Sequence, residues 1–439
     1  MSDAVLSVAA GRTTPPQHRD APWRDGWRSG LSYGALGLPL AFVALPLYVV
    51  LPTYYATEFA VPLAWLGALL LAARLLDAFV DPWIGRRCDL WFARPDKRVL
   101  HVALGAALLL AASFLALFFP PSHELPTLLA WCAATLVLCY LSYSVLSIVH
   151  QSWGARLGGD ALQRARIVSW REGLSLMGVL LASVLASTLG PAVTGAVLVG
   201  ALALAIAGLW HAPRAPVGEV APAAQGMRHA LANASFRRLL GVYLVNGIAS
   251  AIPATLVLFF IRDRLQAPAF EPLFLGSYFL AAALSMPLWM RAVSRFGLAR
   301  SWLAGMLLAI ATFAWAASLG AGDMLGFALV CLASGVALGA DLSLPGALLA
   351  GVIRRAGHGG QSEGLYFGWW NFATKLNLAL AAGIALPLLG LFGYAPGSRD
   401  DAALLALTLA YCALPCALKL IAAALLYWRW WRSPEGSLE

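Results

Sequence analysis

The chain has 439 residues, of which 61% are hydrophobic and only 12% charged, and its formal net charge at pH 7 is +9. Soluble domains carry about 25% charged residues, so this composition excludes a soluble enzyme or binding module. It predicts instead an all-α protein that crosses a membrane many times.

Apolar stretches long enough to span a bilayer as helices occur twelve times along the chain. We place these spans at residues 31–54, 62–82, 99–119, 125–150, 167–189, 191–210, 239–261, 273–291, 301–319, 324–352, 365–393 and 402–428. A polar stretch divides them into two sets of six. The sequence therefore predicts an N-terminal tail (1–28), a six-helix bundle (29–210), a linker (211–238), a second six-helix bundle (239–428) and a C-terminal tail (429–439).

Basic residues are concentrated in alternate connections between the spans. Of the 30 Lys and Arg residues, 23 lie in the two tails, the linker and every second loop, whereas three of the other loops hold only Glu58, Glu124 and Asp323 as charges. This asymmetry follows the positive-inside rule and places both tails and the linker in the cytoplasm. The net charge is thus a topology signal, and we expect no nucleic-acid partner.

The polar N-terminal tail lacks an apolar core segment, so we expect no cleaved signal peptide. The six cysteines lack metal-ligand spacing, and we expect neither a disulfide nor a metal site or other cofactor. The excess of Arg over Lys, with abundant Ala and Leu, is typical of a GC-rich bacterial genome. We therefore expect a monomer in the inner membrane of a bacterial cell, surrounded by the lipid bilayer.

The second span contains three charges, Arg74, Asp77 and Asp81, on one helix face. A charge at the bilayer centre costs roughly 2.5–3.5 kcal/mol on insertion scales, so such residues usually mark a functional site. Two carboxylates one turn apart form an oxygen-rich site for a small cation, either Na⁺ or H⁺. Arg74 could take part in coupling or could simply brace Asp77 on its own helix.

Further polar groups lie in the spans that follow. The fourth span carries a polar stripe that serves either interhelical hydrogen bonding or substrate contact, and its members are Tyr140, Tyr143, Ser147, His150 and Gln151. Arg171, in the fifth span, either binds substrate or extends to the membrane edge. Asp341, in the tenth, either lines the cavity or bonds to backbone groups freed by Pro345.

In the eleventh span, Gly364, Gly368, Asn371 and Lys375 share one face, and the two glycines allow another helix to approach closely. We expect Lys375 to occupy the two carboxylates of the second span when the ion is absent. Ion binding would then displace this lysine and reshape the substrate site, which couples the two ligands. Lys419, in the twelfth span, could extend to the membrane surface.

Short basic turns follow the second and the eighth spans, and Gly85…Asp89 and Arg295-Phe296-Gly297 resemble the loop motif of the major facilitator superfamily. Longer segments resemble one of its groups, the glycoside–pentoside–hexuronide:cation symporters, to which melibiose permease belongs. These segments are LSYG (31–34), RLLDAFVDPWIG (74–85), RARIVSWR (164–171) and EGLYFGWWNFATK (363–375).

The resemblance implies the major facilitator fold, with twelve helices in two bundles that rock around a central cavity. It implies that Asp77 and Asp81 bind the coupling cation, that Lys375 adjoins them, and that Arg171 faces the substrate cavity. We assign Tyr140, Tyr143, Ser147, Gln151, Asn371 and Asp341 to substrate binding as well.

Two departures from the family pattern affect these expectations. The first span lacks the acid that binds sugar in melibiose permease, and Ser147 stands where that protein has a fourth-helix aspartate. The loss of a potential Na⁺ ligand favours H⁺ as the coupling ion. We expect a symporter of a small polar solute such as a glycoside or sugar acid, and a transporter of an amphipathic or lipid-like substrate is the alternative. An enzyme is not expected, because no nucleophile–base pair, metal cluster or phosphate loop stands out.

Overall fold

The computed structural model describes residues 23, 25–94, 97–217 and 226–428. In these residues every regular element is helical, as the composition predicts. The first half contains α1 (Trp27–Gly34), α2 (Gly37–Leu45), η1 (Pro46–Val50), α3 (Leu51–Glu58), α4 (Leu63–Phe92), α5 (Arg98–Phe118), α6 (Leu125–Arg156), α7 (Ala161–Thr188) and α8 (Gly190–His211). Most of the expected N-terminal tail, part of the linker and the C-terminal tail lie outside the described residues.

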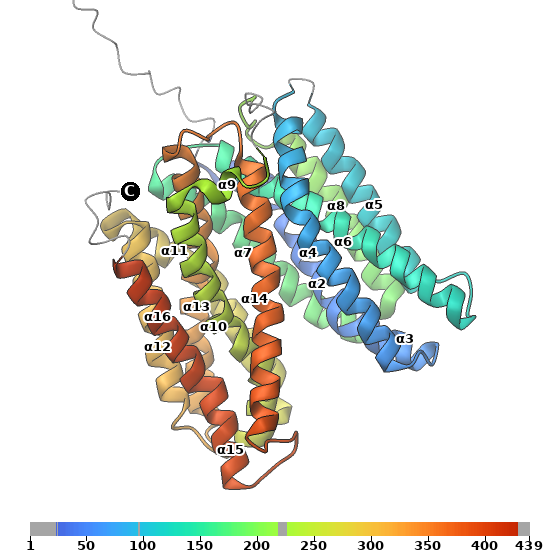
Figure 1. Cartoon of the computed structure of the whole chain (residues 1–439), viewed down its shortest axis with the longest axis vertical. Coiled ribbons are helices and arrows are strands. Elements are labelled where there is room, and N and C mark those ends of the chain that lie inside the picture. Colours follow the sequence, from blue (N-terminus) through green and yellow to red (C-terminus); the bar gives the residue numbers. More distant parts are fainter. Residues whose placement is uncertain (1–22, 24, 95–96, 218–225, 429–439) are drawn as a thin grey trace, which may run out of the picture.

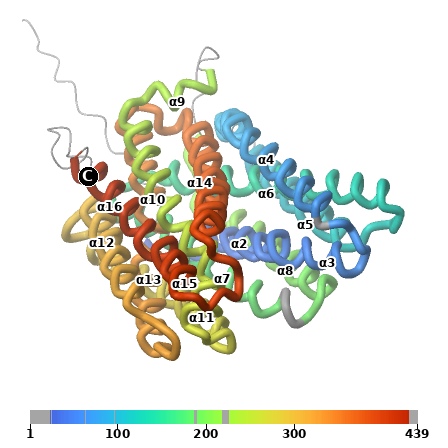
Figure 2. The backbone as a smooth tube through the Cα atoms, turned by 60° about the horizontal axis from the view of Figure 1, so that its bottom comes forward, coloured from blue at the N-terminus to red at the C-terminus, as the bar shows by residue number. Residues whose placement is uncertain are grey.

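The second half begins with the short α9 (His229–Ala232), inside the expected linker. It continues with α10 (Ala234–Phe259), η2 (Phe260–Arg264), η3 (Pro268–Phe270), α11 (Glu271–Phe296), α12 (Leu298–Ala316), α13 (Met324–Arg355), α14 (Glu363–Leu391), α15 (Asp401–Thr408), η4 (Leu409–Ala413) and α16 (Leu414–Leu426). Figures 1 and 2 show the two halves side by side, and α14 lies against α4 while α7 lies against α11 and α13.

Within the described residues, eleven helical segments are long and apolar enough to cross a membrane. The remaining expected span is α4, which is 30 residues long but carries Arg74, Asp77 and Asp81 in its apolar part. Helix α4 packs against α6 and α14, so its charged face is covered by other helices. The eleven segments and α4 correspond to the twelve spans expected from the sequence.

The first span is interrupted by prolines. Pro46 opens η1, a turn of π-helix between α2 and α3, because a proline nitrogen cannot donate the regular helical hydrogen bond. The wider turn brings Tyr48 to within 6.3 Å of the Tyr140 ring on α6, measured between ring centroids.

Two connections are shorter than expected. Helix α4 continues to Phe92, so Arg86 and Asp89 belong to a helix and not to the loop predicted at 83–98. Helices α11 and α12 are separated only by Gly297, whose φ of 79° lies in the left-handed region that glycine tolerates.

Glycines allow α4 and α14 to cross at close range, as the sequence predicts. A Cβ atom on Gly85 would lie 2.1 Å from the backbone oxygen of Gly364. A Cβ atom on Gly368 would lie 2.5 Å from the backbone oxygen of Asp81. The close crossing brings the charged face of α4 against the face of α14 that carries Lys375.

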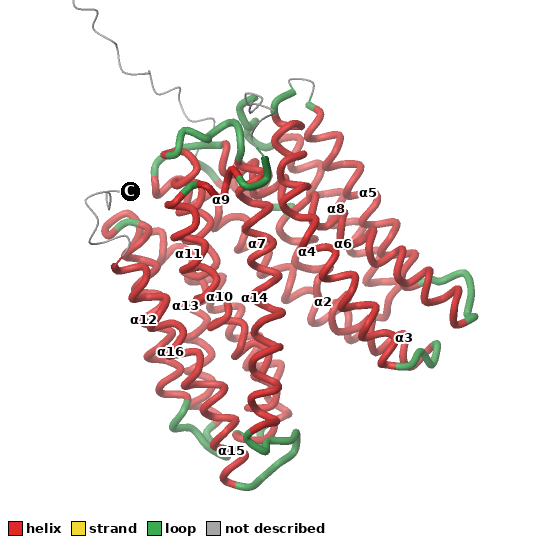
Figure 3. Tube along the Cα trace, viewed as in Figure 1, coloured by secondary structure: helices red, strands yellow, loops and turns green. Residues whose placement is uncertain are grey.

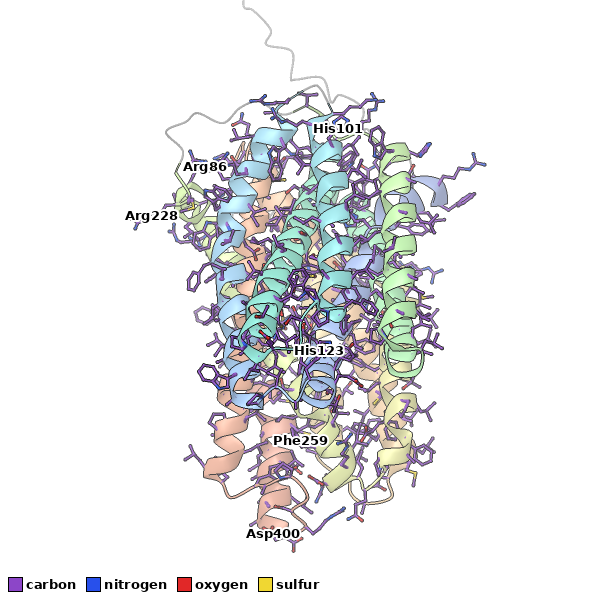
Figure 4. The ribbon with its side chains drawn as sticks, turned by 90° about the vertical axis from the view of Figure 1, so that its right-hand side faces the viewer. Arg86, His101, His123, Arg228, Phe259 and Asp400 are labelled. Atoms are coloured by element: carbon purple, nitrogen blue, oxygen red, sulfur yellow. The ribbon has the colours of Figure 1, made fainter. Side chains whose placement is uncertain are left out.

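The two ends of the molecule differ in charge and in packing. Arg86, His101 and Arg228 lie toward one end in Figure 4, and Asp400 lies at the other. We call the first the basic end and the second the far end. Figures 1 and 3 show that the halves meet near the basic end and diverge toward the far end, where α3 and α15 are widely separated.

Candidate functional site

Asp77, Asp81, Ser144 and Lys375 form one cluster, which we call the carboxylate–lysine cluster. The Lys375 Nζ lies 2.7 Å from Asp77 Oδ2 and 2.7 Å from Asp81 Oδ2. It also donates a hydrogen bond of 2.8 Å to Ser144 Oγ, and this hydroxyl donates to Asp77 Oδ1 at 2.7 Å. The ammonium also donates to Asp81 Oδ1 at 2.8 Å and to the backbone oxygen of Asp77 at 3.4 Å, so its three hydrogens are all engaged.

The cluster is buried and unbalanced in charge. The side chain of Asp81 is fully buried, that of Asp77 is 4% exposed and that of Lys375 is 15% exposed. Two carboxylates and one ammonium leave an excess of one negative charge at a place where uncompensated charge is costly. The arrangement suits the uptake of one monovalent cation or one proton.

Ser144 is a site residue that the sequence reasoning missed. Ser147 holds the register position of the fourth-helix aspartate of melibiose permease, but the structure puts Ser144, one helical turn earlier, beside the carboxylates. Ser147 Oγ instead accepts hydrogen bonds from the amides of Gln151 at 2.9 Å and Asn371 at 3.3 Å. Gln151 also donates to Asn371 Oδ1 at 2.9 Å, which joins α6 to α14. The sequence did contain a signal for Ser144: it lies three residues before Ser147 and therefore on the same side of the helix.

The fourth-span stripe divides between two sides of α6. His150 is buried against the first span, where its Nε2 lies 2.8 Å from the backbone oxygen of Tyr33. The Tyr33 hydroxyl donates to the backbone oxygen of His150 in return. Tyr140 and Tyr143 lie near the charge of Asp77, on the side of the cluster. His150 therefore joins helices, whereas the two tyrosines are placed near the candidate site.

Arg74 does not brace Asp77, which corrects one of the two roles considered for it. Its guanidinium carbon lies 3.9 Å from the centroid of the Tyr48 ring, a cation–π contact between α4 and η1. Asp77 is paired with Lys375 instead, because α14 brings this lysine across the glycine crossing.

Arg171 remains inside the protein and does not extend to the membrane edge. Its Nε and Nη2 atoms donate to Glu172 Oε1 at 2.9 Å and 2.6 Å. Its guanidinium also lies next to Gly346 of α13, in the other half of the molecule. The side chains of the pair are 12% exposed for Arg171 and 18% for Glu172, and the contact with Gly346 places Arg171 between the halves.

Asp341 is fully hydrogen-bonded within the second half. Its Oδ1 accepts from Asn246 at 3.0 Å and from Trp302 at 2.9 Å. Its Oδ2 accepts from Ser250 at 3.1 Å and from Lys419 at 2.8 Å. The donors are side chains rather than backbone groups freed by a proline, and Lys419 is buried in this network instead of extending to the membrane surface.

A third group of charges closes the basic end, and we call Asp89, Arg156 and Glu363 the latch. Arg156 Nη2 lies 3.0 Å from Asp89 Oδ1 and 2.9 Å from Glu363 Oε2. Asp89 Oδ1 and Oδ2 also accept from the backbone nitrogens of Gly364 at 2.7 Å and Leu365 at 2.9 Å. These nitrogens lie in the first turn of α14 and have no partner inside the helix. The latch therefore joins α4 and α6 of the first half to α14 of the second.

The family model described as "MFS/sugar transport protein" matches residues 32–429 of the chain. The "Inner membrane symporter YicJ" of Escherichia coli is 30% identical over 156 residues, which is 36% of this chain and 33% of that protein. The "Glucuronide carrier protein homolog" of Escherichia coli is 24% identical over 429 residues, covering 91% of this chain and 92% of that protein. Identity is thus higher in a part of the chain, and similarity extends over nearly all of it.

Two solved structures resemble the fold. A bacterial homologue of the iron transporter ferroportin, in an outward-facing state, has a TM-score of 0.71 at 17% identity and covers 91% of this chain and 98% of its own. The transporter FucP, in the outward conformation, has a TM-score of 0.65 at 13% identity and covers 90% and 98%. At these identities the likeness concerns the fold alone.

Proposed function

The chain belongs to the MFS/sugar transport protein family, and is thus a multi-pass membrane transporter of the major facilitator superfamily rather than an enzyme; on this premise we propose that it is a cation-coupled symporter of a small polar solute such as a glycoside or sugar acid. The observation that carries the proposal is the carboxylate–lysine cluster, in which one ammonium faces two buried carboxylates. The named relatives, a symporter and a glucuronide carrier homolog, favour a polar solute over an amphipathic or lipid-like one.

Coupling follows from the occupancy of the cluster. Lys375 fills the space between the two carboxylates, so a Na⁺ bound there must displace the ammonium, and a proton on one carboxylate must weaken its ion pair. Either event loosens the contact between α4 and α14, which come from opposite halves. Cation binding and the relative position of the halves are therefore linked through one set of contacts.

Alternating access requires that one end be closed while the other is open. We infer that the basic end is cytoplasmic, because positive loops are retained on that side. The latch closes this end while the helices diverge at the far end, which corresponds to an outward-facing state. Asn371, Gln151 and Arg171 would then contact the solute from the two halves.

The proposal is tested by the thermal stability of the purified protein in Na⁺ or choline medium and at acidic or alkaline pH. We expect Na⁺ or protons to raise the melting temperature of the unchanged protein, and Asp77→Asn and Asp81→Asn to lose that response. Asp400→Asn is the matched control, because Asp400 caps α15 at the far end and Asn caps helices equally well. Retention of the cation response in both cluster variants would refute the assignment of the ion site.

A further inference from the structure

Three arginines from the two halves meet close to the latch, at the basic end. Arg164 lies near the start of α7, whereas Arg354 and Arg355 are the last two residues of α13. The Nη1 atoms of Arg164 and Arg354 both donate to the backbone oxygen of Gly159, at 3.0 Å and 2.5 Å. Two guanidinium groups from opposite halves therefore converge on a single carbonyl oxygen.

Gly351 of α13 brings the third arginine into the same place. A Cβ atom on this glycine would lie 3.2 Å from Nη2 of Arg164 and 3.5 Å from Nη2 of Arg355. Three positive charges thus share one junction between α7 and α13. Because like charges repel, this junction opposes the closure of the basic end unless an anion lies among them.

The described part of the chain pairs neither Arg164 nor Arg354 with a carboxylate. Its ion pairs include neither residue. Asp160 is the carboxylate whose field reaches Arg164, but its Oδ1 accepts from the backbone nitrogen of Gln163 at 2.8 Å and caps α7. The two guanidinium groups keep their positive charge at the contact between the halves.

Arg164 also has a buried donor to spare. The residue is only 6% exposed, and its Nε is buried without a hydrogen-bond partner. A buried N–H of a charged group that lacks an acceptor costs free energy, and an anion beside it would remove this cost. The unpartnered nitrogen and the converging charges point independently to the same kind of ligand.

We propose that Arg164, Arg354 and Arg355 form a binding site for an anionic phosphate group, which bridges the two halves at the basic end. A phosphate group is tetrahedral, carries about one to two negative charges at neutral pH and accepts hydrogen bonds from several directions, whereas a carboxylate presents two oxygens in one plane. Arg354 and Arg355 are exposed, so the group can enter from outside while Arg164 forms the buried base of the site. The group belongs either to a free phosphate ion or to the headgroup of an anionic phospholipid.

The site would act on the position of the halves and not on the coupling site. A bound phosphate holds α7 to α13 and offsets the repulsion between their arginines, so it stabilises the state in which the basic end is closed. Gly159 lies three residues after Arg156, so the phosphate would reinforce the latch from the other side of the α6–α7 connection. The carboxylate–lysine cluster contributes no residue to this site.

The test measures the melting temperature of the purified full-length protein in detergent, at fixed pH, Na⁺ concentration and ionic strength. The probes are inorganic phosphate against chloride, and dioctanoyl phosphatidylglycerol against dioctanoyl phosphatidylcholine. We expect a saturable rise with an anionic phosphate probe and none with chloride or phosphatidylcholine. A rise with inorganic phosphate identifies the free ion as a ligand, and a rise with phosphatidylglycerol alone identifies the lipid headgroup.

Variants of Arg354 separate this site from a general effect of charge. Arg354→Gln should raise the half-saturating concentration of the probe roughly tenfold or more, as expected for the loss of one hydrogen bond to a charged group. Arg237→Gln is the matched control, because Arg237 is an exposed arginine that also donates to backbone oxygens, those of Leu231 and Ala232. It should retain the response of the unchanged protein.

Arg354→Glu tests whether the arginine serves only to hold Gly159. This variant loses the same hydrogen bond as Arg354→Gln but places a carboxylate beside Arg164. It should therefore melt at a higher temperature than Arg354→Gln without any probe, and it should gain nothing from phosphate. Equal melting temperatures of the two variants would show a purely structural role and overturn the inference. Absence of a saturable rise with either phosphate probe, or an equal loss of response in Arg237→Gln, would overturn it as well.

Discussion

We predict that replacing Arg156, the arginine of the latch, will open the basic end of the molecule. In Arg156→Gln, the carboxylates of Asp89 and Glu363 lose their shared cation, although their side chains are only 9% and 3% exposed. The two negative charges then repel each other at the junction of the halves. Opening this end gives both carboxylates access to water, so the variant should favour the state in which the basic end is open.

The size of the effect follows from the burial of the latch. Breaking a buried ion pair by removing one partner costs roughly 3–5 kcal/mol, whereas an exposed pair contributes roughly 0–1 kcal/mol. If this cost falls on the closed state alone, the population of the open state rises roughly 100-fold or more, because 1.4 kcal/mol corresponds to about a factor of ten.

Cys88 provides a natural reporter of this opening. It is fully buried beside Gly364, at the crossing of α4 and α14. In a protein whose other cysteines are replaced by alanine, the rate of maleimide labelling at Cys88 measures how often the crossing opens. We expect Arg156→Gln to raise this rate by the factor given above, up to the rate at which an exposed thiol reacts.

Two controls make the measurement specific. Arg166→Gln removes an arginine of the same end whose ion pair with Asp25 is exposed, and it should leave the labelling rate nearly unchanged. A protein that retains only Cys139, buried next to Ser113 within the first half, should also label slowly with and without Arg156→Gln. An unchanged rate at Cys88, or an equal rise at Cys139, would refute the latch.

Three further substitutions test the rest of the site. Lys375→Met leaves two carboxylates facing each other, so the melting temperature of this variant should depend more steeply on Na⁺ or pH. Proteoliposomes that contain it should no longer accumulate solute against a gradient. Retained accumulation would contradict displacement of the lysine. Lys419→Met removes the ammonium that pairs with Asp341, so it should lower the melting temperature without altering the response to Na⁺ or protons. An altered response would place this network in the coupling site. Gly85→Leu inserts a side chain against the α14 backbone and should accelerate labelling of Cys88. Labelling as slow as in the unchanged protein would mean that the crossing accommodates this side chain without opening.

Much of the fold could be predicted because the bilayer restricts what a chain can do. A membrane span must satisfy its backbone hydrogen bonds internally, so apolar stretches of sufficient length become helices whatever their neighbours. The close approach of another helix to α14 was also visible, since Gly364 and Gly368 repeat on one face; the structure identifies this helix as α4. Helix ends were harder to predict: basic residues after the second span indicated a loop, yet α4 continues to Phe92.

The sequence by itself determined that Asp77 and Asp81 share a helix face inside the membrane, because helical periodicity depends only on local spacing. It also placed Lys375 at these two carboxylates, where the structure has it. Only the tertiary structure decided the further partners of these charges. Ser144 rather than Ser147 contacts the carboxylates, because the rotation of α6 against α4 selects the serine.

The same holds for the remaining charges. Arg74 lies on Tyr48 rather than on Asp77, and Lys419 meets Asp341, because pairing between helices depends on packing angles that local spacing does not encode. Arg156 joins Asp89 to Glu363, which are 274 residues apart in the chain, only once the halves have closed on each other. Local periodicity thus placed the charges in the membrane, and the packing of the helices against one another determined which partner each charge has.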